Sequence, residues 1–326
     1  MKPLRRIMPY GMLVAILAAC AVVLIRGQQI ADWVVLRNYQ APTAIAQLAV
    51  DDTMTSYAQH FFYINRPSLE GKAAFNKHCT NQTEQAVVLG CYRGNRQGIY
   101  LYDVTDTRLQ GVEQVTAAHE MLHQAYDRLS TKERTHIDNL LKDYFQHQLT
   151  DQVVKDQMAA YKKTEPNDLA NEMHSVFGTE IATLPAELEA YYRQYFTDRS
   201  KIITYYSGYQ AEFTQRQQQV TAYDQQLAVL KSQIDAKEAN LTTRQQELQQ
   251  KKDELDRLRN NGSFDAYNEG VPTYNSLVSA YNTEIATTKA LIAQYNALVD
   301  QRNAIAVQEQ QLQQALDSRL APAAKQ

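Results

Sequence analysis

The pattern of apolar and polar positions divides the chain into segments of different character. Residues 7–25 are uncharged and mostly apolar, and they are about long enough to cross the hydrocarbon core of a membrane as a helix. Residues 130–199 contain several helix-start signals and few glycines, which is typical of a helical domain. From about residue 205 onward, apolar side chains recur at every seventh position. The sequence therefore predicts a mainly α-helical protein with an apolar N-terminal segment and a coiled-coil C-terminal part.

The C-terminal heptad pattern forms two series, separated by turn-forming residues between positions 260 and 272. We expect these series to pair as an antiparallel coiled-coil hairpin with arms of about 45–55 residues, or about 70–80 Å. Charged residues at the second seam position of the first series favour a partly open face, so the hairpin is expected to bind a protein partner, to self-associate or to act as a passive stalk. The heptad residues are Tyr206, Phe213, Val220, Leu227, Ile234, Leu241, Leu248 and Leu255, followed by Leu277, Leu291, Leu298, Ile305 and Leu312, with Tyr274, Tyr281 and Tyr295 on the neighbouring seam.

Two β-rich runs lie in the N-terminal half, at residues 86–92 and 98–104. Between them, residues 94–97 read Gly-Asn-Arg-Gln, which favours a turn. The pattern predicts a β-hairpin and therefore a small β-sheet. The expected fold class is thus a mainly α domain with a small β-sheet, followed by a long antiparallel coiled-coil hairpin.

Charged residues on the two sides of the apolar segment predict its orientation. Lys2, Arg5 and Arg6 precede the segment, whereas only Arg26 follows it closely. Because positively charged flanks stay on the cytoplasmic side, we expect a cytoplasmic N-terminus and an extracytoplasmic remainder. A cleaved signal peptide would normally have a shorter apolar region, so the segment is expected to be a single-pass anchor in the cell membrane.

A lipoprotein signal is a second interpretation of this segment. Residues 17–20 (Leu-Ala-Ala-Cys) resemble a bacterial lipoprotein cleavage box, in which Cys20 would carry the lipid. The apolar run continues past this cysteine, which favours the uncleaved anchor. Both interpretations attach the remainder to a membrane outside the cytoplasm, where Cys79 and Cys91 can form a disulfide.

Three domains follow from these patterns. They are an N-terminal transmembrane signal-anchor at residues 1–26, a compact domain at residues 27–200 and the coiled-coil hairpin at residues 201–326. The formal net charge of −3 argues against a nucleic-acid partner, because such proteins need a concentrated basic surface.

His119, Glu120 and His123 form the motif H-E-x-x-H. Histidines four positions apart lie on one face of a helix, where both imidazoles can bind one zinc ion. The adjacent glutamate can then act as a general base toward water. Between positions 115 and 125 this glutamate is the only charged residue, so we expect a buried helix whose polar groups need compensation, for example by zinc.

A catalytic zinc usually has three protein ligands and one open position. An extended motif with a third histidine does not fit, because Tyr126 and Leu129 stand where glycine and histidine are required. The other known solution takes a glutamate from a later helix. Residues 167–180 read as such a helix and are rich in potential ligands.

With these features the chain resembles the gluzincins, zinc metallopeptidases that combine H-E-x-x-H with a downstream glutamate. The resemblance covers roughly residues 85–200 and implies a zincin-like fold and a single Zn²⁺. It implies that His119 and His123 are ligands, that Glu120 is the general base and that Glu172 is the third ligand. It also implies a peptide or protein substrate.

The surroundings of the third ligand depart from the gluzincin pattern. In many gluzincins an acidic residue four positions after the glutamate braces the first histidine, but here that position is Val176. We expect His174 or Glu180 to take the bracing role, and each of them is also an alternate third ligand.

The same resemblance suggests residues that contact substrate. In such peptidases the strand before the active helix often lies at the edge of the cleft, where the substrate adds as a further strand. The candidate edge strand comprises Ile99, Tyr100, Leu101, Tyr102 and Asp103. An ordinary sheet strand without a substrate role is an equally good interpretation of these residues. The candidates for stabilising the transition state are Tyr161, Tyr191 and Tyr192.

The sequence therefore predicts a membrane-anchored, extracytoplasmic zinc endopeptidase. The alternative is a non-catalytic envelope scaffold that uses the hairpin for partner binding and the zincin-like domain as a platform. The two hypotheses differ in whether the protein needs zinc and an open cleft above His119.

Overall fold

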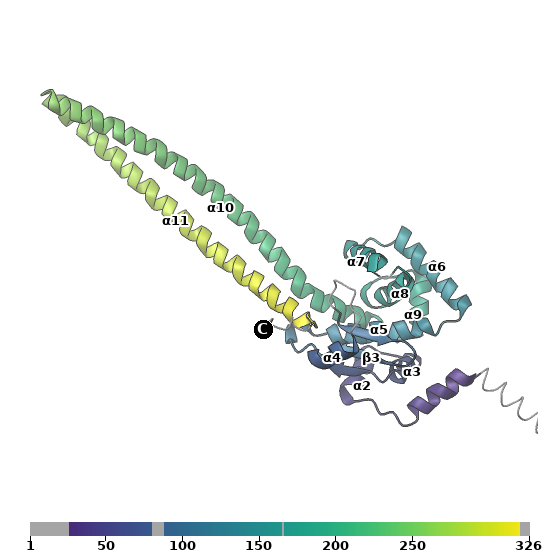
Figure 1. Ribbon diagram of the computed structural model, residues 1–326. Helices are drawn as coiled ribbons and strands as arrows, with labels where there is room; N and C mark the ends of the chain where they lie inside the picture. Colours follow the sequence, from purple (N-terminus) through teal and green to yellow (C-terminus); the bar gives the residue numbers. More distant parts are fainter. Residues whose placement is uncertain (1–25, 80–87, 165, 320–326) are drawn as a thin grey trace, which may run out of the picture. The chain divides into compact units, whose positions relative to one another are not determined.

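The computed structural model describes residues 26–79, 88–164 and 166–319 (Figure 1). The chain divides into two compact units, the first ending at Gln210 and including the segment from Gln314, and the second comprising residues 211–313. The predicted anchor at residues 7–25, with Cys20, lies outside the described residues. In the part that the structure describes, no helix is both long enough and apolar enough to cross a membrane.

The first unit is mainly helical and contains a small three-stranded sheet, as the sequence predicts. The capping box of Ser130 and Glu133 is formed at the start of one helix. After a first helical segment at residues 26–36, the helices are α2 (Thr43–Asp51), α3 (Ser56–Ile64), α4 (Lys72–His78), the 3-10 helix η1 (Thr107–Leu109), α5 (Val112–Asp127), α6 (Thr131–His147), α7 (Gln152–Thr164), α8 (Leu169–Glu180) and α9 (Ala186–Tyr192).

The sheet has the strand order β1-β3-β2, with β1 at Ser68–Glu70, β2 at Gly90–Arg93 and β3 at Gly98–Tyr102. The antiparallel pairing of β2 with β3 confirms the predicted β-hairpin. In its turn, Asn95 and Arg96 both adopt positive φ values of 57° and 61°, which suit a tight hairpin connection.

The prediction that residues 99–103 form an edge strand is wrong. Ile99 to Tyr102 belong to β3, which is the central strand, because β1 pairs with it in parallel on one side and β2 pairs with it on the other. Asp103 follows the strand. Since both sides of β3 already carry ladder hydrogen bonds, this strand cannot accept a substrate backbone. Among the residues that the structure describes, the side of the hairpin without a partner strand belongs to β2.

Helix α5 lies at the centre of the first unit, with the sheet on one side and α8 on the other (Figure 1). The small side chains of Ala117 and Ala118 and the larger ones of Met121 and Leu122 are all fully buried. Removing this apolar surface from water is the main source of stability, at about 25 cal/mol for each Å² buried. The motif helix is therefore a core element, as its uncharged flanks predict.

Two further connections fix the N-terminal elements. Cys79, which ends α4, forms a disulfide with Cys91 on β2, so the predicted pair is present. Asp32, on the helical segment at residues 26–36, accepts hydrogen bonds from Arg96 at 2.8 Å and from Arg128 at 3.0 Å. The segment that follows the predicted anchor is thus held on the first unit.

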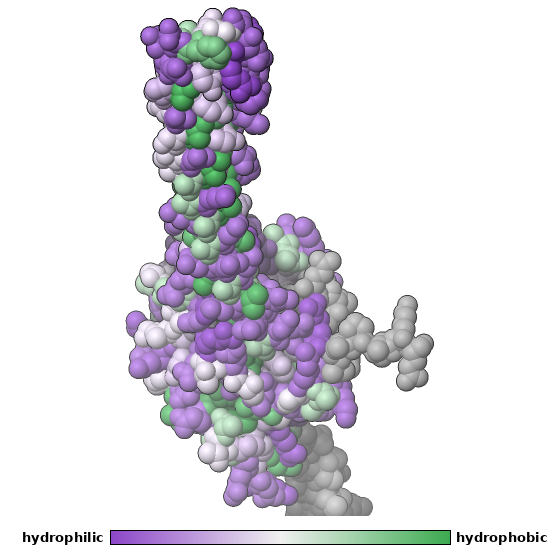
Figure 2. All heavy atoms as spheres, turned by 90° about the vertical axis from the view of Figure 1, so that its left-hand side faces the viewer, coloured by the Kyte–Doolittle hydropathy of each residue, from purple (hydrophilic) through white to green (hydrophobic). Residues whose placement is uncertain are grey.

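The long helices α10 (Ser200–Asn260) and α11 (Phe264–Leu316) pack against each other, and the second unit consists of their residues 211–313 with the turn between them. Lys237 lies 3.2 Å from Glu284, and Arg302 lies 3.1 Å from Asp224, so the pairing is antiparallel. The predicted heptad positions are the less exposed ones along both helices. Figure 2 shows apolar side chains following the hairpin between polar flanks.

Two details of the hairpin differ from expectation. The turn comprises only residues 261–263, and α11 continues through Gly270 and Pro272, which the sequence places in a loop. Gly270 packs closely on the other helix, because a Cβ there would lie 2.7 Å from a methyl carbon of Leu255. The charged seam residue Lys237 forms an ion pair with Glu284 on the other helix. At this position the charge has a partner within the hairpin and does not need a third helix or another protein.

Candidate metal centre

His119 and His123 lie one turn apart on α5, and their side chains converge. Their Nε2 atoms are 3.0 Å apart. His123 is buried, and the side chain of His119 retains 16% of its exposure. Two nitrogen lone pairs at this distance repel each other, so the pair needs either a shared proton or a cation between them. The helix thus brings together two nitrogen donors that could bind one metal ion.

Glu172, in the first turn of α8, supplies the third donor. Its carboxylate oxygens lie 3.6 Å from Nε2 of His123 and 3.8 Å from Nε2 of His119. One donor atom from each residue can be chosen so that all three lie within 4.8 Å of one another. In the part of the chain that the structure describes, these residues form the group that could hold a metal ion.

The spacing fits a tetrahedral zinc site. Nitrogen and oxygen ligands at about 2.0–2.1 Å from zinc lie about 3.3 Å from each other in tetrahedral geometry. The donor distances of 3.0, 3.6 and 3.8 Å lie on both sides of this value. Two imidazoles and one carboxylate are also a ligand set that leaves one position open for chemistry.

Close packing of α8 on α5 brings Glu172 to the histidines. Gly178 makes this contact possible, because a Cβ at that position would lie 2.5 Å from a methyl carbon of Leu122 and 2.8 Å from the ring of Tyr192. Any larger residue would separate the two helices or displace buried side chains. The sequence alone does not reveal this role of Gly178.

Asn171 orients the second histidine. Its Oδ1 lies 3.0 Å from Nδ1 of His123, and its Nδ2 donates to Asp168 at 3.2 Å. Because the amide nitrogen faces a carboxylate, Oδ1 is the acceptor, and His123 donates its Nδ1 proton to it. The Nε2 lone pair of His123 then faces the metal cluster, which is the tautomer that a ligand needs.

The bracing prediction is therefore corrected. Among the described residues, His174 hydrogen-bonds to Tyr191 and Glu180 to Gln157 and Tyr206, and the brace that the structure shows, from Asn171, acts on the second histidine. His174 is fully buried among aromatic rings, and its Nε2 lies 2.8 Å from the hydroxyl of Tyr191. It is a core histidine and does not join the metal group.

The charges around the histidines act in opposite directions. Burial and the neighbouring His123 and His174 hold the pKa of His119 well below its usual value. Burial also lowers the pKa of His123, but the carboxylates of Glu172 and Glu120 outweigh it and raise the pKa to about 9. Of the two histidines, His123 therefore holds a proton more tightly than His119.

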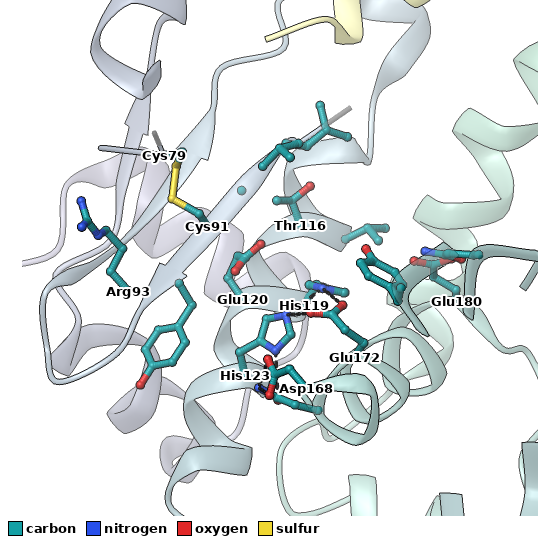
Figure 3. A pocket seen from close by; sticks show the side chains of 18 of the residues that line it. Cys79, Cys91, Arg93, Thr116, His119, Glu120, His123, Asp168, Glu172 and Glu180 are labelled. Carbon is teal, nitrogen blue, oxygen red and sulfur yellow. Dashed lines mark hydrogen bonds and ion pairs between the residues drawn. A yellow bond between two sulfur atoms is a disulfide. The ribbon is translucent and has the colours of Figure 1, made fainter. Parts of the chain in front are cut away.

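Glu120 lies between the histidines and strand β2. A Cβ at Gly90 would lie 2.7 Å from its Oε1 and 2.9 Å from its Cγ, so the absence of a side chain at Gly90 makes room for the carboxyl group. Figure 3 shows Glu120 beside His119 and His123 in the same cavity. A carboxylate in this place can exchange protons with water at the metal group.

These residues line a cleft of about 840 Å³. Its walls come from α5, α7 and α8, from residues 88–95 around strand β2 and from the first three turns of α10. Tyr161 lines the cleft, whereas Tyr191 and Tyr192 do not, because their hydroxyls bind His174. Tyr161 is thus the one of the three predicted tyrosines that can reach a bound molecule.

Compared with known proteins, the chain matches no family model, no curated protein and no solved structure. The interpretation of the cleft therefore depends on its own residues and their geometry.

Proposed function

We propose that this protein is a membrane-anchored zinc endopeptidase of the gluzincin type. The observation that carries the proposal is the convergence of His119, His123 and Glu172 in a cleft that also contains Glu120. A spacing of 49 residues separates His123 from Glu172, so this convergence is a property of the fold and not of a local motif. The donor set and its distances fit zinc with an open coordination position.

The chain's own residues have separate roles in this proposal. A zinc ion held by the three donors would polarise the scissile carbonyl and acidify water in the cleft. Glu120 accepts a proton from the attacking water and returns it to the leaving amine, which is general acid–base catalysis. Asn171 keeps the Nε2 lone pair of His123 directed into the site. Tyr161, in the wall of the cleft, would donate a hydrogen bond to the developing oxyanion.

We propose that the substrate extends along β2. This strand is an edge of the sheet, and Gly90, Cys91, Tyr92 and Arg93 all line the cleft. A peptide that adds to an edge strand gains main-chain hydrogen bonds without regard to its sequence. The contact of Gly90 with Glu120 places this edge beside the general base.

An extracytoplasmic location is part of the proposal. The apolar segment at residues 7–25 supplies the anchor, and positive charges before it favour a cytoplasmic N-terminus. The disulfide between Cys79 and Cys91 is consistent with an oxidising compartment. The substrate would then be a peptide or protein at the outer side of the membrane.

The proposal is tested with the full-length protein in detergent, as wild type and as Glu120→Gln, His123→Ala and Glu172→Ala. Metal content is measured by mass spectrometry, and hydrolysis is measured from new termini in a mixture of proteome-derived peptides. We expect about one zinc in the wild type and its loss in both alanine variants. We expect Glu120→Gln to retain zinc and to lose activity by about 10²–10⁴-fold.

Three results would contradict the proposal or a part of it. Wild-type activity in pure Glu120→Gln protein would exclude Glu120 as the base. A folded wild-type protein that does not bind zinc would favour the scaffold hypothesis, in which the hairpin recruits a partner or a second copy of the chain. Loss of zinc in His123→Ala but not in Glu172→Ala would remove Glu172 from the ligand set.

A further inference from the structure

A second polar group lies in the cleft, away from the metal donors. Glu180 is the last residue of α8, and its carboxylate accepts hydrogen bonds from Gln157 on α7 and from Tyr206 on α10. Tyr209 lines the cleft next to it, and the rings of Tyr206 and Tyr209 lie 5.6 Å apart in an edge-to-face arrangement. One carboxylate and two aromatic rings therefore meet at a single place in the wall.

This group lies at a defined distance from the metal donors. Glu172 and Glu180 are eight residues apart on α8, which corresponds to about 12 Å along the helix axis. Figure 3 shows Glu180 on the opposite side of the histidine pair from Arg93. The cleft thus runs from a basic residue at the end of β2, past the metal donors, to an acidic residue at the end of α8.

The surroundings of Glu180 favour a positive ligand. The two charged residues with the strongest effect on its carboxylate are Asp151 and Glu172, and both are acidic. Burial, together with these two carboxylates, raises the pKa of Glu180 to about 7. A cation placed here would be attracted by the carboxylate and by the adjacent tyrosine rings, and it would offset the repulsion between Glu180 and Asp151.

We propose that Glu180, Tyr206 and Tyr209 form a subsite that binds a basic side chain of the substrate. This inference rests on the proposed peptidase function and specifies its substrate class. An extended peptide advances about 3.3 Å per residue, so the helix distance of about 12 Å places the basic residue three to four positions from the scissile bond. Lysine and arginine both fit, since each combines a charge with a long apolar stem that can lie along the tyrosine rings.

The test uses full-length Glu120→Gln protein, which retains the cleft without turning substrate over. Fluorescent ten-residue peptides with blocked termini carry lysine, uncharged norleucine or glutamate at one position in an alanine–serine background, and binding is followed by anisotropy. We expect lysine to bind about tenfold more tightly than norleucine at one or two neighbouring positions. Adding Glu180→Gln removes this preference, and adding Glu180→Arg transfers it to glutamate.

The matched control is Glu187→Gln in the same background, because Glu187 is an exposed glutamate on α9 that does not line the cleft. It should leave the lysine preference unchanged. A lysine-free peptide with an unblocked N-terminus distinguishes a free α-amino group from a side chain as the bound cation. If only that peptide shows the preference, the side-chain assignment is wrong.

Failure of the subsite and failure of the enzyme give different results. Equal binding of all peptides, including no binding at the highest concentration, overturns the subsite even if the protein contains zinc and hydrolyses peptides. Absence of zinc overturns the peptidase proposal whatever the peptides do. Unfolding temperatures and zinc contents of the Glu180 variants are compared with the parent, so that a folding defect is not mistaken for a lost preference.

Discussion

Gly178 sets the distance between the two helices that carry the candidate metal donors, and the substitution Gly178→Ala tests this role directly. The added Cβ would lie 2.5 Å from a methyl carbon of Leu122 and 2.8 Å from a ring carbon of Tyr192. Carbon atoms pack at about 3.5–4.0 Å, so the contact is too short by about 1 Å. Leu122 and Tyr192 are fully buried and have little room to move. We therefore expect α8 to shift away from α5.

The expected cost can be worked out from opposing terms. Overpacking of a core typically costs about 1–3 kcal/mol, while alanine is favoured over glycine within a helix by about 1 kcal/mol. The net effect is a loss of about 0–2 kcal/mol in the free energy of unfolding. Metal–ligand distances in zinc sites lie within about 0.2 Å of their standard values, so a lasting displacement of Glu172 should weaken zinc binding by about tenfold or more.

The assay combines chemical unfolding of the full-length protein with zinc affinity from competition against a chelating dye. The matched control is Gly208→Ala on α10, because Gly208 is exposed and a Cβ added there would meet no atom within 4 Å. In this control the free energy of unfolding should rise by up to about 1 kcal/mol, and the zinc affinity should stay unchanged. If Gly178→Ala behaves like the control in both measurements, the close contact does not position Glu172.

Two further predictions concern His123. Asn171→Ala should weaken zinc binding by about 10–100-fold in dye competition, because it removes the acceptor that fixes the tautomer of His123. Unchanged zinc affinity in this variant would show that the hydrogen bond is dispensable. Zinc binding at pH 7.5 should release about one proton, because the pKa of His123 is about 9 and the metal must displace that proton. The apparent affinity for zinc should rise about tenfold from pH 7 to pH 8 and level off above pH 9. Calorimetry in buffers of different ionisation enthalpy counts the released protons. If no proton is released, His123 is not the protonated ligand that zinc binding must deprotonate.

The parts of the site that could be predicted are those that local periodicity determines. The spacing of His119 and His123 places them on one face of any α-helix. The uncharged residues around them indicate that this helix is buried, and the structure places it in the core. The heptad spacing of the hairpin is equally local, and its seam is formed at the predicted positions.

The missed features depend on contacts between distant segments. Asn171 contacts His123 across 48 residues, and nothing in the sequence around either residue indicates the pair. The error over β3 has the same origin. Strand β1 has only three residues and pairs in parallel with a strand 32 positions away, as Ser68 does with Tyr100, so no alternating pattern reveals it. When only the hairpin of β2 and β3 is recognised in the sequence, β3 is interpreted as an edge strand.

In the proposed peptidase, helix α8 carries both a metal donor and a residue of the proposed substrate subsite. The helix carries the third donor, Glu172, in its first turn, the contact residue Gly178 in its second half and the proposed subsite residue Glu180 at its end. Its residues from Asn171 to Thr179 are buried, so the helix is held on most sides and cannot flex independently. The separation between Glu172 and Glu180 is therefore fixed by helix geometry and not by a loop. Substitutions in the exposed turn at residues 261–263 should leave this separation unchanged, whereas a shift of α8 would change metal affinity and substrate preference together.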